Sequence, residues 1–104
     1  MSLLHYYANP SRFLIENLEI GCNLISEAAN MGVKNIINLG SSCMYPRNAI
    51  NPLKEEYLLQ GELEPTNEGY AIAKIASQRL CEYLKIEDPS RNYITLMPCN
   101  LYGK

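Results

Sequence analysis

The 104-residue sequence lacks tryptophan and contains one histidine, one phenylalanine and four cysteines. His5 is the single imidazole, and Cys22, Cys43, Cys81 and Cys99 include no Cys-x-x-Cys pair, so the usual spacing of a zinc site is missing. The cysteines also show neither close pairs nor a neighbouring secretory signal, as a disulfide framework would. We therefore expect no metal site, and four cysteines that remain thiols.

Long apolar runs and clusters of one charge are missing too. No stretch approaches 18 consecutive apolar residues, so no membrane-spanning helix is expected. The net charge is −2 without a basic cluster, which argues against nucleic acid as the main partner. Hydrophobic residues make up 47% of the chain, which is too many for a disordered protein. The composition agrees with a globular cytoplasmic protein.

The spacing of apolar residues predicts a helix over residues 11–31 and a strand over 33–39, the latter rich in β-branched residues. A long loop with several prolines then spans 46–69, followed by a helix over 69–86 and a strand over 92–97. This helix–strand–helix–strand order predicts an α/β fold, part of a doubly wound parallel sheet. The length permits one domain at most.

Tyr70 and Lys74 lie four residues apart in the second predicted helix. Positions i and i+4 share one helix face, so the phenol and the ammonium can point into a common pocket. A nearby positive charge favours the ionised form of a phenol, which makes it useful in proton transfer. Ser41 or Ser42, at the end of the first predicted strand, could hydrogen-bond the substrate oxygen where the proton moves. The alternative is a Tyr and a Lys on a solvated helix face, which occurs by chance on many helices.

Three segments carry a family resemblance: LGSSCMYP at 39–46, LLQGELEPTNEGYAIAKIA at 58–76 and MPCNLYG at 97–103. The Tyr-x-x-x-Lys pattern alone is weakly specific, whereas the cysteine two places after the first serine, together with QGELEPTNEGYAIAK, is far more specific. On these segments the chain resembles the extended short-chain dehydrogenase/reductase (NAD-dependent epimerase/dehydratase) family, and within it the GDP-L-fucose synthase group. The resemblance covers nearly the whole chain and implies a partial Rossmann-like fold.

The resemblance implies catalytic roles for four residues. Tyr70 would protonate the C4 oxygen of a keto sugar as hydride arrives from NADPH, while Lys74 favours the phenolate and hydrogen-bonds the nicotinamide ribose. Ser41 matches the family's catalytic serine, with Ser42 beside it as a substrate contact. Cys43 matches the cysteine that exchanges protons during epimerisation. Without the resemblance, Cys43 is better interpreted as a small, partly buried apolar residue at a strand end.

Further contacts are implied near the second strand. The cofactor would contact Tyr70, Lys74, Pro98 and Leu101, and the sugar would contact Asn100. For Pro98, Asn100 and Leu101 the alternative is an ordinary strand end followed by a turn. A helix asparagine of the family that supports the catalytic pocket corresponds to Asn17, although a mid-helix asparagine is more often merely exposed.

The glycine-rich turn on which this family binds the pyrophosphate of NADP(H) does not occur, because Gly21, Gly32 and Gly40 are scattered. The family's C-terminal sugar-binding domain has no counterpart either. The chain therefore resembles the middle third of an enzyme. We expect the isolated chain to be inactive and to bind NADPH weakly at most.

The function implied is that of a fragment of an NADP-dependent epimerase/reductase, which performs 3,5-epimerisation and 4-reduction of a GDP-4-keto-6-deoxy sugar. Two alternatives stay open: a non-catalytic remnant that only self-associates, and a fragment of another nucleotide-sugar epimerase or dehydratase. The resemblance also implies a homodimer through helices 11–31 and 69–86.

The apolar faces of the two predicted helices support self-association. We expect the faces around Leu18, Ile25, Ile72 and Leu80 to stay in water unless a partner covers them. Burying a large aliphatic side chain contributes about 1.5–3 kcal/mol, which would favour a dimer.

Overall fold

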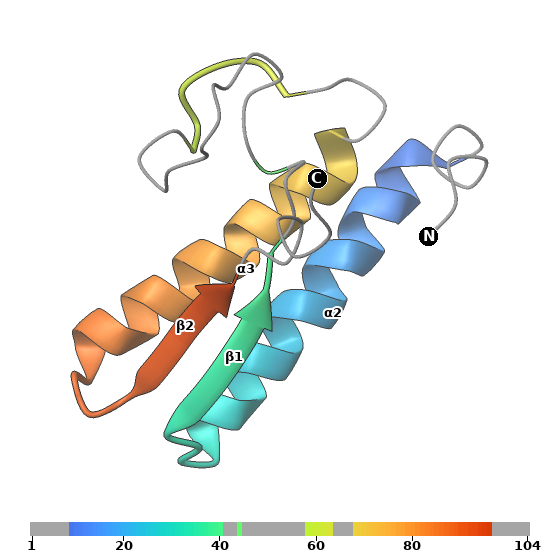
Figure 1. Ribbon diagram of the computed structural model, residues 1–104. Helices are drawn as coiled ribbons and strands as arrows, with labels where there is room; N and C mark the ends of the chain where they lie inside the picture. The colour runs from blue at the N-terminus through green and yellow to red at the C-terminus, as the bar shows by residue number, and fades with distance from the viewer. Residues whose placement is uncertain (1–8, 41–43, 45–57, 64–67, 97–104) are drawn as a thin grey trace.

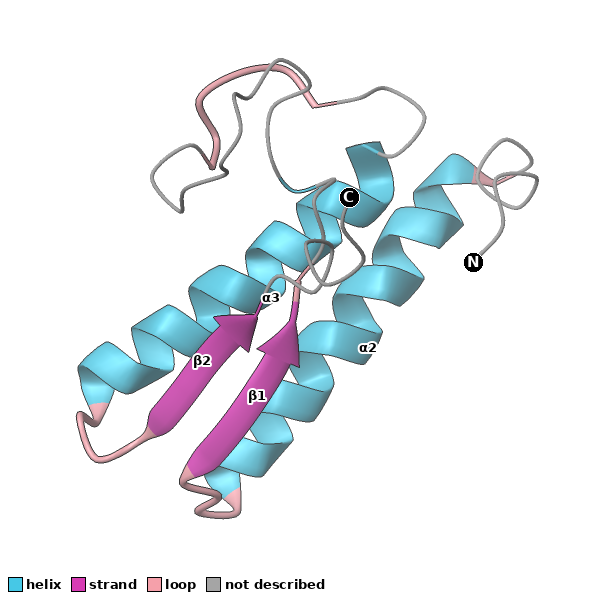
Figure 2. Cartoon of the chain, viewed as in Figure 1, coloured by secondary structure: helices cyan, strands magenta, loops and turns pink. Residues whose placement is uncertain are grey.

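The computed structural model describes residues 9–40, 44, 58–63 and 68–96. Figures 1 and 2 show helix α2 (Pro10–Asn30), strand β1 (Asn35–Leu39), helix α3 (Glu68–Glu87) and strand β2 (Asn92–Leu96) in the order α-β-α-β. Each helix and strand begins and ends within two residues of its predicted limits. The predicted α/β fold class is confirmed.

Helix α2 begins and ends where its sequence provides the appropriate residues. Pro10 occupies the first turn, where a missing backbone N–H costs no hydrogen bond. At the other end Gly32 has a positive φ of 84°, a conformation that glycine adopts without steric cost. The Val33 N–H donates to the Ala28 carbonyl oxygen at 3.0 Å and so completes the helix end. Val33 is therefore not available for the sheet, and β1 starts two residues later than predicted.

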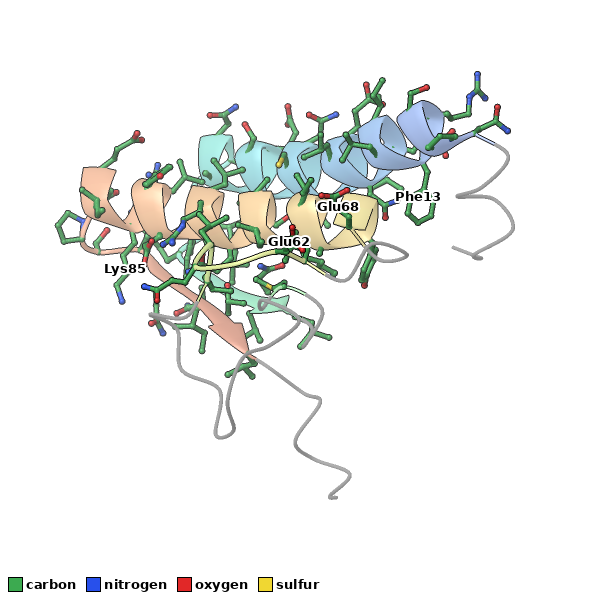
Figure 3. All side chains as sticks on the ribbon, turned by 90° about the horizontal axis from the view of Figure 1, so that it is seen from above. Phe13, Glu62, Glu68 and Lys85 are labelled. Atoms are coloured by element: carbon green, nitrogen blue, oxygen red, sulfur yellow. The ribbon has the colours of Figure 1, made fainter. Side chains whose placement is uncertain are left out.

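Strands β1 and β2 form a parallel two-stranded sheet. Ile37 pairs with Ile94 and Leu39 with Leu96 in its register. All four of these side chains are exposed on one face of the sheet. Both helices cover the opposite face, where they lie side by side (Figures 1 and 3). A helix-over-sheet arrangement of two layers results, in which α2 and α3 pack on each other and α3 packs on both strands.

The core lies between the helices and the covered face of the sheet. Its buried members come from both helices and from β2, and partly buried aliphatic side chains pack against them: Ile25, Ala29, Cys81 and Tyr93, surrounded by Ile36, Leu80 and Leu84. The phenol of Tyr93 donates a hydrogen bond to the Val33 carbonyl oxygen, which ties the start of β2 to the loop between α2 and β1.

The prediction that apolar faces stay in water was wrong for Ile25 and Leu80. Ile25 is only 5% exposed and Leu80 packs against the core. Ile72 is exposed as expected. The large apolar side chains that are more than half exposed are different ones: Ile15, Ile20 and Leu24 on α2, Met31 directly after it, and Tyr83 and Ile86 on α3.

The two cysteines within the described ranges, Cys22 and Cys81, are free thiols, as predicted. Burial raises the pKa of the Cys81 thiol, and the neighbouring Cys22 adds to this effect. Cys43, Cys99 and His5 lie outside the described residues. Among those described, no cluster of metal-ligating side chains occurs, and no helix is long and apolar enough to cross a membrane.

A polar cluster joins the two loops at the amino ends of the strands. Lys34 Nζ lies 3.3 Å from Asp88 Oδ2 and donates to Ser90 Oγ at 2.9 Å. Ser90 donates to Asp88 Oδ1 from its hydroxyl at 2.7 Å and from its backbone N–H at 3.1 Å. These bonds lower the pKa of Asp88 to about 2, and the two bonds from Ser90 contribute most to this effect. The cluster therefore helps to align the two strands while Asp88 is ionised.

Candidate active site

Tyr70 and Lys74 lie on one face of the first turns of α3. Lys74 Nζ is 5.6 Å from the centroid of the Tyr70 ring, and both side chains are half-buried. Glu68 begins the helix, so its carboxylate stands where an acidic group favours the helix dipole. The helical spacing thus places phenol and ammonium together, as their four-residue separation predicts.

The Lys74 side chain reaches from the helix to the sheet. Its Nζ donates a hydrogen bond of 2.9 Å to the carbonyl oxygen of Leu39, which is the last residue of β1. The next residue, Gly40, donates its N–H to the Leu96 carbonyl oxygen at 2.7 Å, which holds the carboxyl ends of both strands together. The ammonium is therefore fixed at the carboxyl edge of a parallel sheet, the edge at which such folds bind their ligands.

A cavity of about 110 Å³ lies between α2, α3 and β1 beside this pair. Its lining is largely polar or small: Asn17, Ile20, Gly21, Asn38, Tyr70, Ala73, Lys74 and Ser77. A space of this size holds a few water molecules and is too small for a nucleotide sugar. It is thus a packing feature behind the candidate catalytic pair and not itself the substrate site.

Three residues of the cavity wall carry structural roles that the sequence analysis missed. Asn38 donates from Nδ2 to Thr95 Oγ1 at 3.2 Å, which makes a polar pair across the sheet. Gly21 and Ser77 form a close contact between the helices. A glycine inside a helix is the signal that could have identified Gly21. No such signal marks Asn38, because β1 contains a second asparagine, Asn35. Asn17, which was identified, donates from Nδ2 to the Phe13 carbonyl oxygen at 2.7 Å.

The other predicted site residues lie outside the described residues. Ser41, Ser42 and Cys43 follow Gly40, and Pro98, Asn100 and Leu101 follow the described end of β2. Because Gly40 and Leu96 are hydrogen-bonded, both segments continue from neighbouring points at the same edge of the sheet. Their roles stay predictions. Within the described chain, the structure brings Tyr70, Lys74 and Asn17 together around one cavity.

The arrangement is suited to proton transfer. A phenol beside an ammonium can give a proton to a substrate oxygen, and the positive charge stabilises the phenolate that remains. Among the described residues, Leu39 takes one of the three N–H groups of Lys74, which leaves two for hydroxyl oxygens of a ligand. This donor set fits the ribose of a nicotinamide cofactor.

Comparison with known proteins shows what the chain is similar to. Residues 3–104 match the model of the NAD dependent epimerase/dehydratase family. GDP-L-colitose synthase of Yersinia pseudotuberculosis is 53% identical over 96 residues, which are 92% of this chain and 31% of that protein. GDP-L-fucose synthase of Escherichia coli K12 is 49% identical over 94 residues, 90% of this chain and 29% of that protein.

A solved structure agrees in fold. GDP-D-glycero-L-gluco-heptose synthase of Campylobacter jejuni, solved in the presence of NADPH, superposes with a TM-score of 0.80 at 44% identity. The match covers 86% of this chain and 26% of that one. The chain thus spans under a third of the length of these relatives. Because the family model matches almost the whole sequence, the chain belongs to the NAD-dependent epimerase/dehydratase family.

Proposed function

We propose that this chain is the central catalytic section of an NADP-dependent nucleotide-sugar epimerase/reductase of the GDP-L-fucose synthase type. The reaction is reduction of the C4 ketone of a GDP-4-keto-6-deoxy sugar, preceded by epimerisation at C3 and C5. The observation that carries the proposal is the Tyr70–Lys74 pair, fixed on the Leu39 carbonyl oxygen at the carboxyl edge of the sheet. The names of the relatives, which act on GDP sugars, support the substrate class.

In this proposal Tyr70 delivers the proton and Lys74 organises the site. The Tyr70 phenol protonates the C4 oxygen, and the Lys74 ammonium stabilises the phenolate that is left. Ser41 holds the C4 oxygen by a hydrogen bond and Ser42 contacts the sugar. Cys43 exchanges protons at the carbons beside the ketone, a task that needs its own acid–base group.

NADPH supplies the hydride when it is bound. The two N–H groups of Lys74 not bonded to Leu39 would hold the nicotinamide ribose, while Pro98 and Leu101 would contact the ring side of the cofactor and Asn100 the sugar. The sequence holds no glycine-rich turn for the pyrophosphate. We therefore assign only the nicotinamide half of the cofactor site to this chain. Thiols at Cys22 and Cys81 agree with a reducing, cytoplasmic location.

We further propose that two copies associate through α2 and α3. Ile20 and Leu24 on α2 and Met31 directly after it recur at four- and seven-residue intervals, and each is at least 66% exposed. Tyr83 and Ile86 form a corresponding exposed apolar patch on α3. Burying such stripes against a second copy would remove several large side chains from water, each contributing about 1.5–3 kcal/mol. A non-catalytic remnant that only self-associates would have the same exposed apolar residues. The experiment that distinguishes it from an enzyme must therefore measure catalysis.

A hybrid enzyme tests the proposed reaction. The 94-residue segment of the Escherichia coli K12 GDP-L-fucose synthase that matches this chain is replaced by the corresponding residues of this chain. We expect the hybrid to oxidise NADPH in the presence of a GDP-4-keto-6-deoxy sugar, because the chain contributes all of the proposed acid–base residues. A correctly folded hybrid that binds NADPH but reduces no sugar would contradict the proposal. Purified parent synthase and a hybrid with Lys74→Met serve as positive and negative controls.

A further inference from the structure

Helices α2 and α3 meet closely at Gly21 and Ser77. A Cβ atom placed on Gly21 would lie 2.4 Å from Ser77 Oγ, a separation that real Cβ atoms essentially never show. The same Cβ would lie 3.7 Å from Ser77 Cβ, which is ordinary van der Waals contact. The hydroxyl of Ser77 thus occupies the space that a side chain at position 21 would need.

The Ser77 hydroxyl is not free to turn away without a cost. Ser77 is 4% exposed, and its Oγ donates to the Ala73 carbonyl oxygen at 3.3 Å. Turning it would break this bond and leave a buried hydroxyl in need of another partner. If it stays, the contact must open from 2.4 Å to the ordinary 3.4 Å, so the helices must move apart by about 1 Å.

Both residues belong to the wall of the cavity that Tyr70 and Lys74 also line. Ser77 follows Lys74 by three residues, so the two side chains lie on neighbouring turns of one helix face. Lys74 reaches the Leu39 carbonyl oxygen at 2.9 Å. A displacement of α3 by about 1 Å along this bond would lengthen it beyond hydrogen-bonding distance.

We propose that Gly21 is a positioning residue for Lys74, and through it for Tyr70. The missing side chain leaves room for the Ser77 hydroxyl between the helices, and this close fit, which we call the interlock, allows α3 to lie where the Lys74 ammonium meets the end of β1. The catalytic consequence rests on the proposed function. The geometric consequence, a change at the Lys74–Leu39 bond, does not.

The geometric part is tested on the 104-residue chain by NMR, with the carbonyl carbon shift of Leu39 as reporter of its hydrogen bond. The difference between wild type and Lys74→Met defines the full effect of the bond. We expect the Leu39 shift of Gly21→Ala to move at least half of the way from the wild-type value to the Lys74→Met value. The double variant Gly21→Ala/Ser77→Ala should recover the wild-type shift, because the new Cβ then meets only a Cβ at 3.7 Å. Ser77→Ala alone, and Asn23→Ala at an exposed position of α2, should leave the shift unchanged.

The catalytic part uses the same variants in the hybrid enzyme. Gly21→Ala should lower kcat by about tenfold or more, since a misplacement of about 1 Å can cost up to 10²-fold. The double variant should return to within about twofold of the unmodified hybrid. An inactive hybrid whose Leu39 shifts behave as expected refutes the proposed function and leaves the interlock intact.

Two results would overturn the inference. One is a Leu39 shift that Gly21→Ala leaves at the wild-type value. The other is a change of the Leu39 shift in Gly21→Ala that the added Ser77→Ala does not reverse. If Gly21→Ala alone fails to fold, a folded double variant with the wild-type shift supports the interlock, because the single and double variants differ only in the Ser77 hydroxyl. A double variant that also fails to fold contradicts the interlock.

Discussion

Replacing Lys74 by methionine removes the ammonium and keeps most of the aliphatic length of the side chain. The charge lies 5.6 Å from the centre of the Tyr70 ring. In the proposed reaction this ammonium stabilises the negative charge that develops on the phenol oxygen as the proton leaves. Removing one such electrostatic group typically lowers kcat by about 10²–10³-fold, so we expect Lys74→Met to slow reduction by about that factor.

Loss of Lys74 also removes the hydrogen bond to the Leu39 carbonyl oxygen and the donors proposed for the ribose. We therefore expect the KM for NADPH to rise while kcat falls. Steady-state NADPH oxidation by the hybrid enzyme measures both, and Lys85→Met, at an exposed position in the last turn of the same helix, controls for the loss of a lysine. A folded Lys74→Met hybrid with a kcat within threefold of the parent would refute the electrostatic reasoning.

Three further outcomes follow from other parts of the chain. Cys43→Ser in the hybrid should slow the incorporation of solvent deuterium beside the ketone while hydride transfer persists; incorporation at the unmodified rate would remove Cys43 from the epimerisation. Because the pKa of Asp88 is about 2 in the folded chain against 3.8 ordinarily, its stabilising contribution is present above pH 3.8 and is lost as the pH falls towards 2. Urea unfolding of Asp88→Asn should accordingly show a smaller loss of stability over that interval than wild type, and an unchanged acid dependence would contradict this. Leu24→Glu should weaken self-association in sedimentation experiments because it charges the exposed stripe of α2, whereas Ser26→Glu, an exposed polar position on the same helix, should not; equal effects would argue against that interface.

The sequence predicts the helices and strands well because each is bounded by a local signal. Pro10 and Gly32 delimit α2, and the β-branched residues of the first strand favour extended structure. The start of β1 is the exception. The N–H of Val33 is used by the Ala28 carbonyl oxygen, and residue type does not reveal that competition.

Side-chain burial was less predictable, because it depends on how two helices rotate against each other and against a sheet. The sequence pattern could not decide that Ile25 and Leu80 enter the core while Leu24 and Ile86 stay exposed. Within the site, helical spacing was sufficient to bring Tyr70 and Lys74 together. The anchoring of Lys74 on the Leu39 carbonyl oxygen could not be predicted, since any backbone carbonyl can accept such a bond.

The central claim is that Tyr70 donates the proton in reduction, and a comparison of two tyrosine variants in the hybrid enzyme tests it most directly. Tyr70→Phe removes only the phenol oxygen beside Lys74, while Tyr83→Phe makes the same chemical change at an exposed position of the same helix. We predict that NADPH oxidation falls by roughly 10²–10⁴-fold in the first variant, the usual contribution of a positioned general acid, and stays within about twofold of the parent in the second. Nearly unchanged turnover of a folded Tyr70→Phe hybrid would contradict the account.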